Sequence, residues 1–72
     1  MSDGSSLTWE DSYAIAVELH RLHPQIALES VSIGMIYDWT VALPDFADDP
    51  ALANERILAD IYQEWFEEVN PV

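Results

Sequence analysis

The segment between Pro44 and Pro50 constrains the fold more than any other part of the chain. Proline inside a helix removes a backbone donor and clashes with the preceding turn, whereas proline at a first helical position fits well. We therefore expect one helix to end before Pro44 and another to begin near Pro50. Phe46 is the one large apolar residue between them, and its burial would hold the neighbouring carboxylates together at the surface. The aspartates around it are Asp45, Asp48 and Asp49.

Three helices are predicted by apolar residues that recur at helical spacing, over about residues 9–22, 35–43 and 51–69. The residues that define them are Ile15, Leu19 and Leu22, then Ile36, Trp39 and Leu43, and finally Ile57, Leu58, Ile61, Trp65 and Val69. Thr8 and Asp11 fit a capping box for the first helix, for which Asp11 itself is a rival N-cap. Gly34 fits the N-cap of the second helix, and Asp49 fits that of the third. Residues 31–33 alternate as a very short strand would.

The fold class that follows is mainly α: a compact three-helix domain with winged-helix-like connectivity and at most one very short strand. Seventy-two residues allow a single domain with a small core. Half of the residues are hydrophobic, which is too many for a disordered acidic tail. We expect residues 1–6 to be a disordered leader and residues 7–72 to form one acidic helical domain.

The charge of the chain excludes several classes of partner. Fourteen acidic residues and two arginines give a formal net charge of −12, which repels nucleic acid and anionic membranes and attracts cations and basic proteins. The absence of cysteine excludes a disulfide, a thiolate metal site and a thiol nucleophile. No targeting segment or membrane-spanning run is recognisable, so we expect a soluble cytoplasmic protein.

Carboxylates around the two prolines are candidate ligands for a hard cation. Asp45, Asp48, Asp49 and Glu55 offer the oxygen ligands that Fe²⁺, Mn²⁺, Mg²⁺ or Ca²⁺ accepts. Each acid also has a simpler explanation: Asp49 as a cap, Asp48 in the favourable field of a helix start, and Asp45 as a loop residue. The spacing of an EF-hand is missing, so any site here would be open, shallow and weak.

The remaining polar and aromatic residues point to a binding module and not to an enzyme. His20 and His23 are expected to be exposed, and Asn54 is expected to hydrogen-bond the backbone of the acidic loop. The three tryptophans are expected in the core, since Trp9, Trp39 and Trp65 fall on or beside apolar stripes. No nucleophile with a base, no carboxyl pair with opposed environments and no glycine-rich phosphate loop is present.

Several motifs, taken together, resemble the IscX family of small acidic iron-sulfur cluster assembly proteins. These are Leu7-Thr8-Trp9, Trp39 with Leu43, the run Asp45-Phe46-x-Asp48-Asp49-Pro50, Asn54-Glu55-x-Ile57-Leu58, and Trp65. The resemblance covers about residues 7–69. It implies a winged-helix-like fold, no obligatory cofactor, weak Fe²⁺ or Fe³⁺ binding, and docking on the cysteine desulfurase in competition with frataxin. It also implies a regulator or adaptor of assembly, not a catalyst.

The acidic face expected to meet the desulfurase comprises Glu10, Asp11, Glu18, Asp38, Asp45, Asp48 and Glu55. One segment departs from the family pattern, in which the second helix tends to start with an aromatic-Thr-Asp-Leu sequence. This chain has Ile33-Gly34-Met35-Ile36 instead, so we expect the loss of a hydroxyl cap and of one acid at that edge. Two alternatives stay open: an iron carrier that delivers Fe²⁺ to the cluster scaffold, and an acidic interaction module unrelated to clusters.

Overall fold

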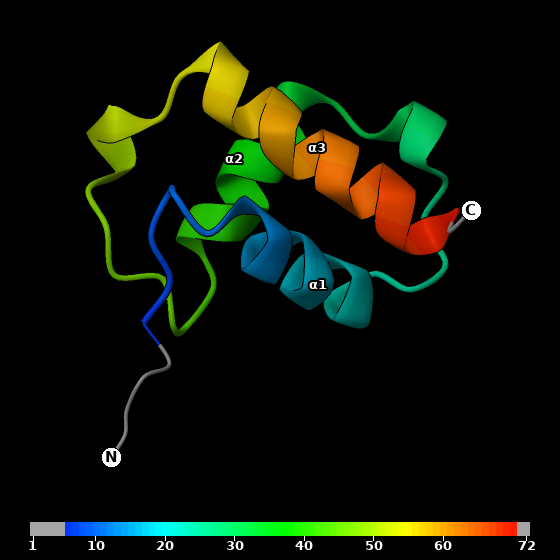
Figure 1. Cartoon of the computed structure of the whole chain (residues 1–72), viewed down its shortest axis with the longest axis horizontal. Coiled ribbons are helices and arrows are strands. Elements are labelled where there is room, and N and C mark those ends of the chain that lie inside the picture. The colour runs from blue at the N-terminus through cyan, green and yellow to red at the C-terminus, as the bar shows by residue number, and fades with distance from the viewer. Residues whose placement is uncertain (1–5, 71–72) are drawn as a thin grey trace.

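Residues 6–70 are described by a computed structural model of the chain (Figure 1). Within them lie three α-helices and two 3₁₀ turns: α1 (Ser12–Leu22), η1 (Leu28–Ser30), α2 (Ile33–Val41), η2 (Pro50–Leu52) and α3 (Glu55–Val69). The mainly helical, compact fold predicted from the apolar spacing is confirmed. No helix of residues 6–70 is long and apolar enough to cross a membrane.

The core lies where the three helices meet. Figure 1 shows α1 and α3 side by side, and α2 packs against both. Ile15 and Leu19 of α1, Ile36 of α2, and Ile61 and Trp65 of α3 are completely buried. The predicted stripes extend too far at two helix ends, because Leu22 is 47% exposed and Val69 is 42% exposed.

The first helix begins three residues later than predicted. The Asp11 carboxylate accepts from the Thr8 amide at 2.9 Å, as a capping box requires, but the Asp11 amide donates to the Thr8 carbonyl at 2.9 Å and not to its hydroxyl. Residues 8–11 therefore form a turn that precedes α1, and Asp11 occupies the N-cap position. Thr8 is therefore not the N-cap, because the backbone closes the turn itself, and the alternative prediction of Asp11 as the cap is confirmed.

The start of α2 also differs from the prediction. Ser32 is its N-cap, and the Ser32 hydroxyl accepts from the Met35 amide at 3.1 Å. Gly34 and Ile33 lie inside the helix, so the predicted glycine cap and the short strand at residues 31–33 are both wrong. A hydroxyl cap was expected to be missing from the segment Ile33-Gly34-Met35-Ile36. Ser32, one residue before that segment, supplies the cap, so this expectation is wrong.

The segment predicted to start the third helix at about residue 51 contains two separate N-caps, Asp49 and Asn54. The Asp49 carboxylate accepts from the Ala51 amide at 2.9 Å and caps η2, not α3. Ala53 is extended, and the Asn54 side chain then accepts from the Ile57 amide at 2.9 Å as the N-cap of α3. Asn54 therefore starts a helix and does not hold the acidic loop, because its side-chain oxygen is used on α3.

An extended pair forms at a place the sequence did not indicate. Leu7 and Phe46 make a single parallel bridge: the Leu7 amide donates to the Asp45 carbonyl at 2.8 Å, and the Ala47 amide donates to the Leu7 carbonyl at 2.9 Å. No longer strand forms within residues 6–70, so the winged-helix likeness stays a prediction. Most of the predicted leader, residues 1–5, and Pro71 lie outside the described residues.

Candidate functional site

Trp9 attaches the acidic loop to the beginning of the chain. The indole Nε1 donates to the Asp49 carbonyl at 2.8 Å, and the Trp9 amide donates to the Asp48 carboxylate at 3.0 Å. Trp9 is 4% exposed, and its ring meets the Phe46 ring edge-on at a centroid distance of 4.7 Å and stacks with Tyr37 at 6.2 Å. The prediction that Trp9 is a core residue is confirmed. The sequence analysis did not predict that Trp9 anchors the loop. Asp48 and Asp49 lie 39 and 40 positions after Trp9, and no local sequence pattern connects residues so far apart.

The three aspartates of the loop have different environments. Asp48 is half-buried, and its two carboxylate oxygens accept from the amides of Trp9 and of Asp49, the latter at 2.7 Å. Asp49 is exposed and caps η2. Asp45 is exposed, and its carboxylate has no hydrogen-bond donor in the part of the chain that is described. Asp48 is therefore a structural residue, whereas Asp45 presents a carboxylate to solvent.

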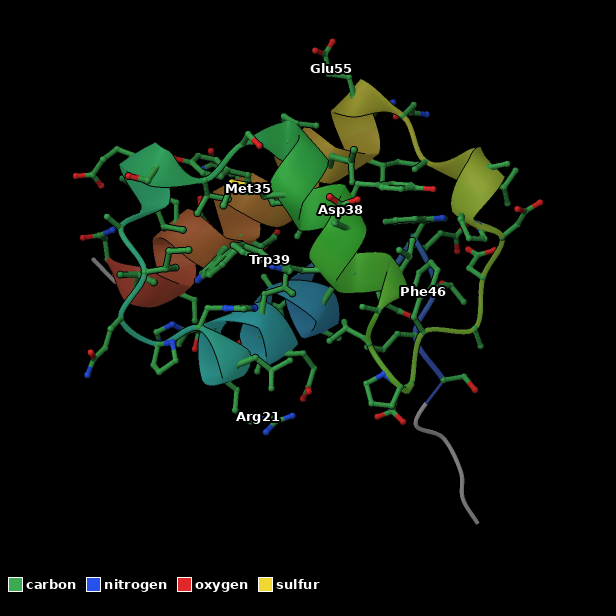
Figure 2. All side chains as sticks on the ribbon, turned by 180° about the vertical axis from the view of Figure 1, so that it is seen from behind. Arg21, Met35, Asp38, Trp39, Phe46 and Glu55 are labelled. Atoms are coloured by element: carbon green, nitrogen blue, oxygen red, sulfur yellow. The ribbon has the colours of Figure 1, made fainter. Side chains whose placement is uncertain are left out.

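The four predicted metal ligands are not gathered into one site. Among residues 6–70, no group of three or more His, Asp or Glu side chains is placed to hold a metal ion. Figure 2 shows Glu55 projecting from the molecule at the start of α3, on the side opposite to Arg21. A carboxylate at that position is stabilised by the helix dipole without any metal. The distribution of these acids thus provides no preformed chelate, and iron binding stays a prediction.

The predicted partner-binding acids fall into two groups. Asp11 and Asp48 accept from backbone amides, and Glu18 accepts from Arg21 at 2.7 Å. The others are exposed, and within residues 6–70 their carboxylates make no ion pair or hydrogen bond. This second group comprises Glu10, Asp38, Asp45 and Glu55. Figure 2 shows Asp38 on the outer face of α2. Four of the seven predicted acids, on separate segments, are thus exposed and unpaired within residues 6–70.

Arg21 supplies a cation near part of this acidic face. Its guanidinium donates to Glu18 at 2.7 Å, and this hydrogen bond, followed by the negative charges of Glu18 and of Asp45, raises the Arg21 pKa. Asp45 thus lies in the field of Arg21 but forms no ion pair with it. Because Arg21 is exposed, its ion pair with Glu18 is screened by water and contributes little to stability.

The two histidines are half-buried and not exposed as predicted. His23 ends α1, where its amide donates to the Leu19 carbonyl at 2.8 Å. Its ring stacks on Trp39 with a centroid distance of 4.1 Å and lies 6.5 Å from the Trp65 centroid. Trp39 is half-buried, whereas Trp65 is completely buried. The turn at Pro24 brings His23 over the tryptophans, so its position is explained by packing.

Two comparisons with known proteins found similar sequences. The family model described as iron-sulphur cluster assembly matches residues 7–70. An uncharacterized protein of Pseudomonas aeruginosa is 36% identical over 63 residues, which cover 88% of this chain and 96% of that protein. The matched region includes every element from the Leu7 bridge to the end of α3.

Proposed function

Because the chain belongs to the iron-sulphur cluster assembly family, we propose that it is a cytoplasmic, non-catalytic adaptor that docks on the cysteine desulfurase of that assembly. The observation that carries the proposal is the set of four exposed, unpaired acids on separate segments of residues 6–70: Glu10, Asp38, Asp45 and Glu55. A positively charged patch on the desulfurase is the complementary surface.

Docking by this surface depends on long-range charge. A chain with a net charge of −12 is drawn to a positive patch, and the exposed carboxylates then form contacts that need no metal. Frataxin competes if it uses the same patch, as the resemblance to IscX proteins implies. Occupation of a patch near the active site changes the access of frataxin or of the cluster scaffold, which makes the chain a regulator of assembly.

The state of the loop aspartates favours an adaptor over an iron carrier. A carrier needs several free ligands around one ion, but Asp48 and Asp49 are used as acceptors for backbone amides. Asp45 and Glu55 stay free for weak association with Fe²⁺. The third alternative, an acidic module unrelated to clusters, is disfavoured by the family to which the chain belongs.

Titration of the desulfurase with two matched double variants tests the proposal. Asp38→Asn with Glu55→Gln removes two charges from the acidic face, whereas Glu29→Gln with Glu67→Gln removes two exposed charges elsewhere. We expect the first pair to weaken docking at least tenfold and the second to change it less than threefold, with frataxin displacing the parent chain. Equal binding by both variants, or no binding by the parent, would contradict the proposal.

A further inference from the structure

A surface groove lies where the first described residues, α1 and the acidic loop meet. It has a volume of about 400 Å³ and is lined by Leu7, Tyr13, Ala14, Val17, Glu18 and Asp45. Leu7 and Asp45 lie side by side in its lining, because the hydrogen bonds of Leu7 to the Asp45 carbonyl and from the Ala47 amide hold the chain start against the loop. Figure 1 shows the blue chain start running beside this loop next to α1.

The apolar lining of the groove is not used by the core. Residues 13–17 are five consecutive apolar residues, and a helix cannot turn all of them to one side. Ile15 and Ala16 are completely buried, whereas Tyr13 is 58% exposed and lies one turn before Val17 on the same face. The helix thus carries a second apolar stripe, Tyr13 and Val17, which lines the groove. Much of Tyr13 stays exposed to water.

The charges at the edge of the groove indicate what could fill it. Glu18 is already paired with Arg21, whereas the Asp45 carboxylate makes no hydrogen bond within residues 6–70. A cation is therefore accommodated best at Asp45, next to the apolar wall. A second copy of the chain is a poor occupant, because two chains of net charge −12 repel each other.

We propose that this groove receives an apolar side chain of the desulfurase, with an adjacent Lys or Arg of the same segment placed on Asp45. The proposal rests on the proposed function for the identity of the partner. The groove contact differs in kind from the charge contacts of the acidic face. It buries apolar surface against Tyr13, and salt does not screen such burial. Docking then has a salt-dependent part and a part that persists at high salt.

Titrations of the desulfurase over a range of salt concentrations separate the two parts. Tyr13→Ala keeps a good helix former in α1 and removes the exposed ring. We expect it to weaken docking about tenfold at every salt concentration, the scale of one aromatic anchor, without changing the salt dependence. Asp45→Asn should weaken docking mainly at low salt. Leu52→Ala is the matched control, since Leu52 is 59% exposed but lies on η2, and it should bind like the parent.

The outcomes distinguish the groove from the acidic face. If the parent binds and Tyr13→Ala binds equally well at all salt concentrations, the groove proposal is overturned and the proposed function stands. A parent that does not bind the desulfurase overturns the proposed function and this proposal with it. Sedimentation of the chain alone is the second measurement: a dimer abolished by Tyr13→Ala would overturn the proposal by showing that a second copy fills the groove.

Discussion

The indole Nε1 of Trp9 donates a 2.8 Å hydrogen bond to the backbone carbonyl of Asp49, 40 positions away in the chain. Because the ring is 4% exposed, the bond is shielded from water, and breaking it leaves a carbonyl without its donor. The contact joins the turn before α1 to the loop that carries the acids. It makes the geometry of the acidic loop depend on a residue outside the loop.

Trp9→Phe should destabilise the chain by about 2 kcal/mol, because it removes the donor to Asp49 and part of a buried ring. The free energy of unfolding from urea titration checks this. Trp39→Phe is the control: Trp39 is half-buried and lacks a hydrogen bond to the loop, so a smaller loss is expected. Equal losses in the two variants would show that the bond to Asp49 contributes nothing specific.

Asp45 and Asp48 should respond differently to replacement by Asn. Asp48→Asn places an amide group where two backbone N–H groups need acceptors, and should cost about 1–3 kcal/mol. Asp45→Asn should leave the melting temperature unchanged or raise it, because it removes an exposed charge from a strongly negative chain. Thermal unfolding followed by circular dichroism measures both. A neutral Asp48→Asn would contradict the structural role of that carboxylate.

Phe46→Ala should cost about 1–2 kcal/mol, less than a fully buried aromatic would, because Phe46 is only half-buried in its T-shaped contact with Trp9. Ile61→Ala, at a completely buried position of α3, should cost about 2–5 kcal/mol. Urea denaturation of the two variants gives the comparison. A larger loss for Phe46 than for Ile61 would make the loop, and not the helical core, the main source of stability.

Added salt should raise the melting temperature near neutral pH. Within residues 6–70 one ion pair, Arg21–Glu18, is present, and it is exposed, so screening removes little attraction and much repulsion. Calorimetric scans at low and high sodium chloride measure the effect. A melting temperature that falls steadily with salt would show that unrecognised attractive pairs dominate.

Fe²⁺ should bind weakly, because no group of three ligands is preformed within residues 6–70. Asp45→Asn with Glu55→Gln should abolish most of the anaerobic calorimetric signal if the free carboxylates carry it. Tight one-to-one binding that survives this double change would place the iron on other residues.

Several features of the protein could be predicted from the sequence because local rules decide them. The buried stripes of α1 and α3 follow from apolar residues at helical spacing, and the break between α2 and α3 follows from the geometry of Pro44 and Pro50. The motifs that resemble a cluster assembly family were also readable without a structure. The helix starts were predicted less well, because Ser32 and Asn54 compete with neighbouring residues that can also cap.

Only the tertiary structure decided which acids are free. Asp45 and Asp48 look alike in the sequence, but the fold places the Trp9 amide on Asp48 and leaves the Asp45 carboxylate to solvent. The stacking of His23 on Trp39 and the groove beside Tyr13 likewise join segments that are distant along the chain. Residue type and spacing determine what a segment can form locally. Which polar atoms stay unpaired depends on the groups that packing brings to them from elsewhere in the chain.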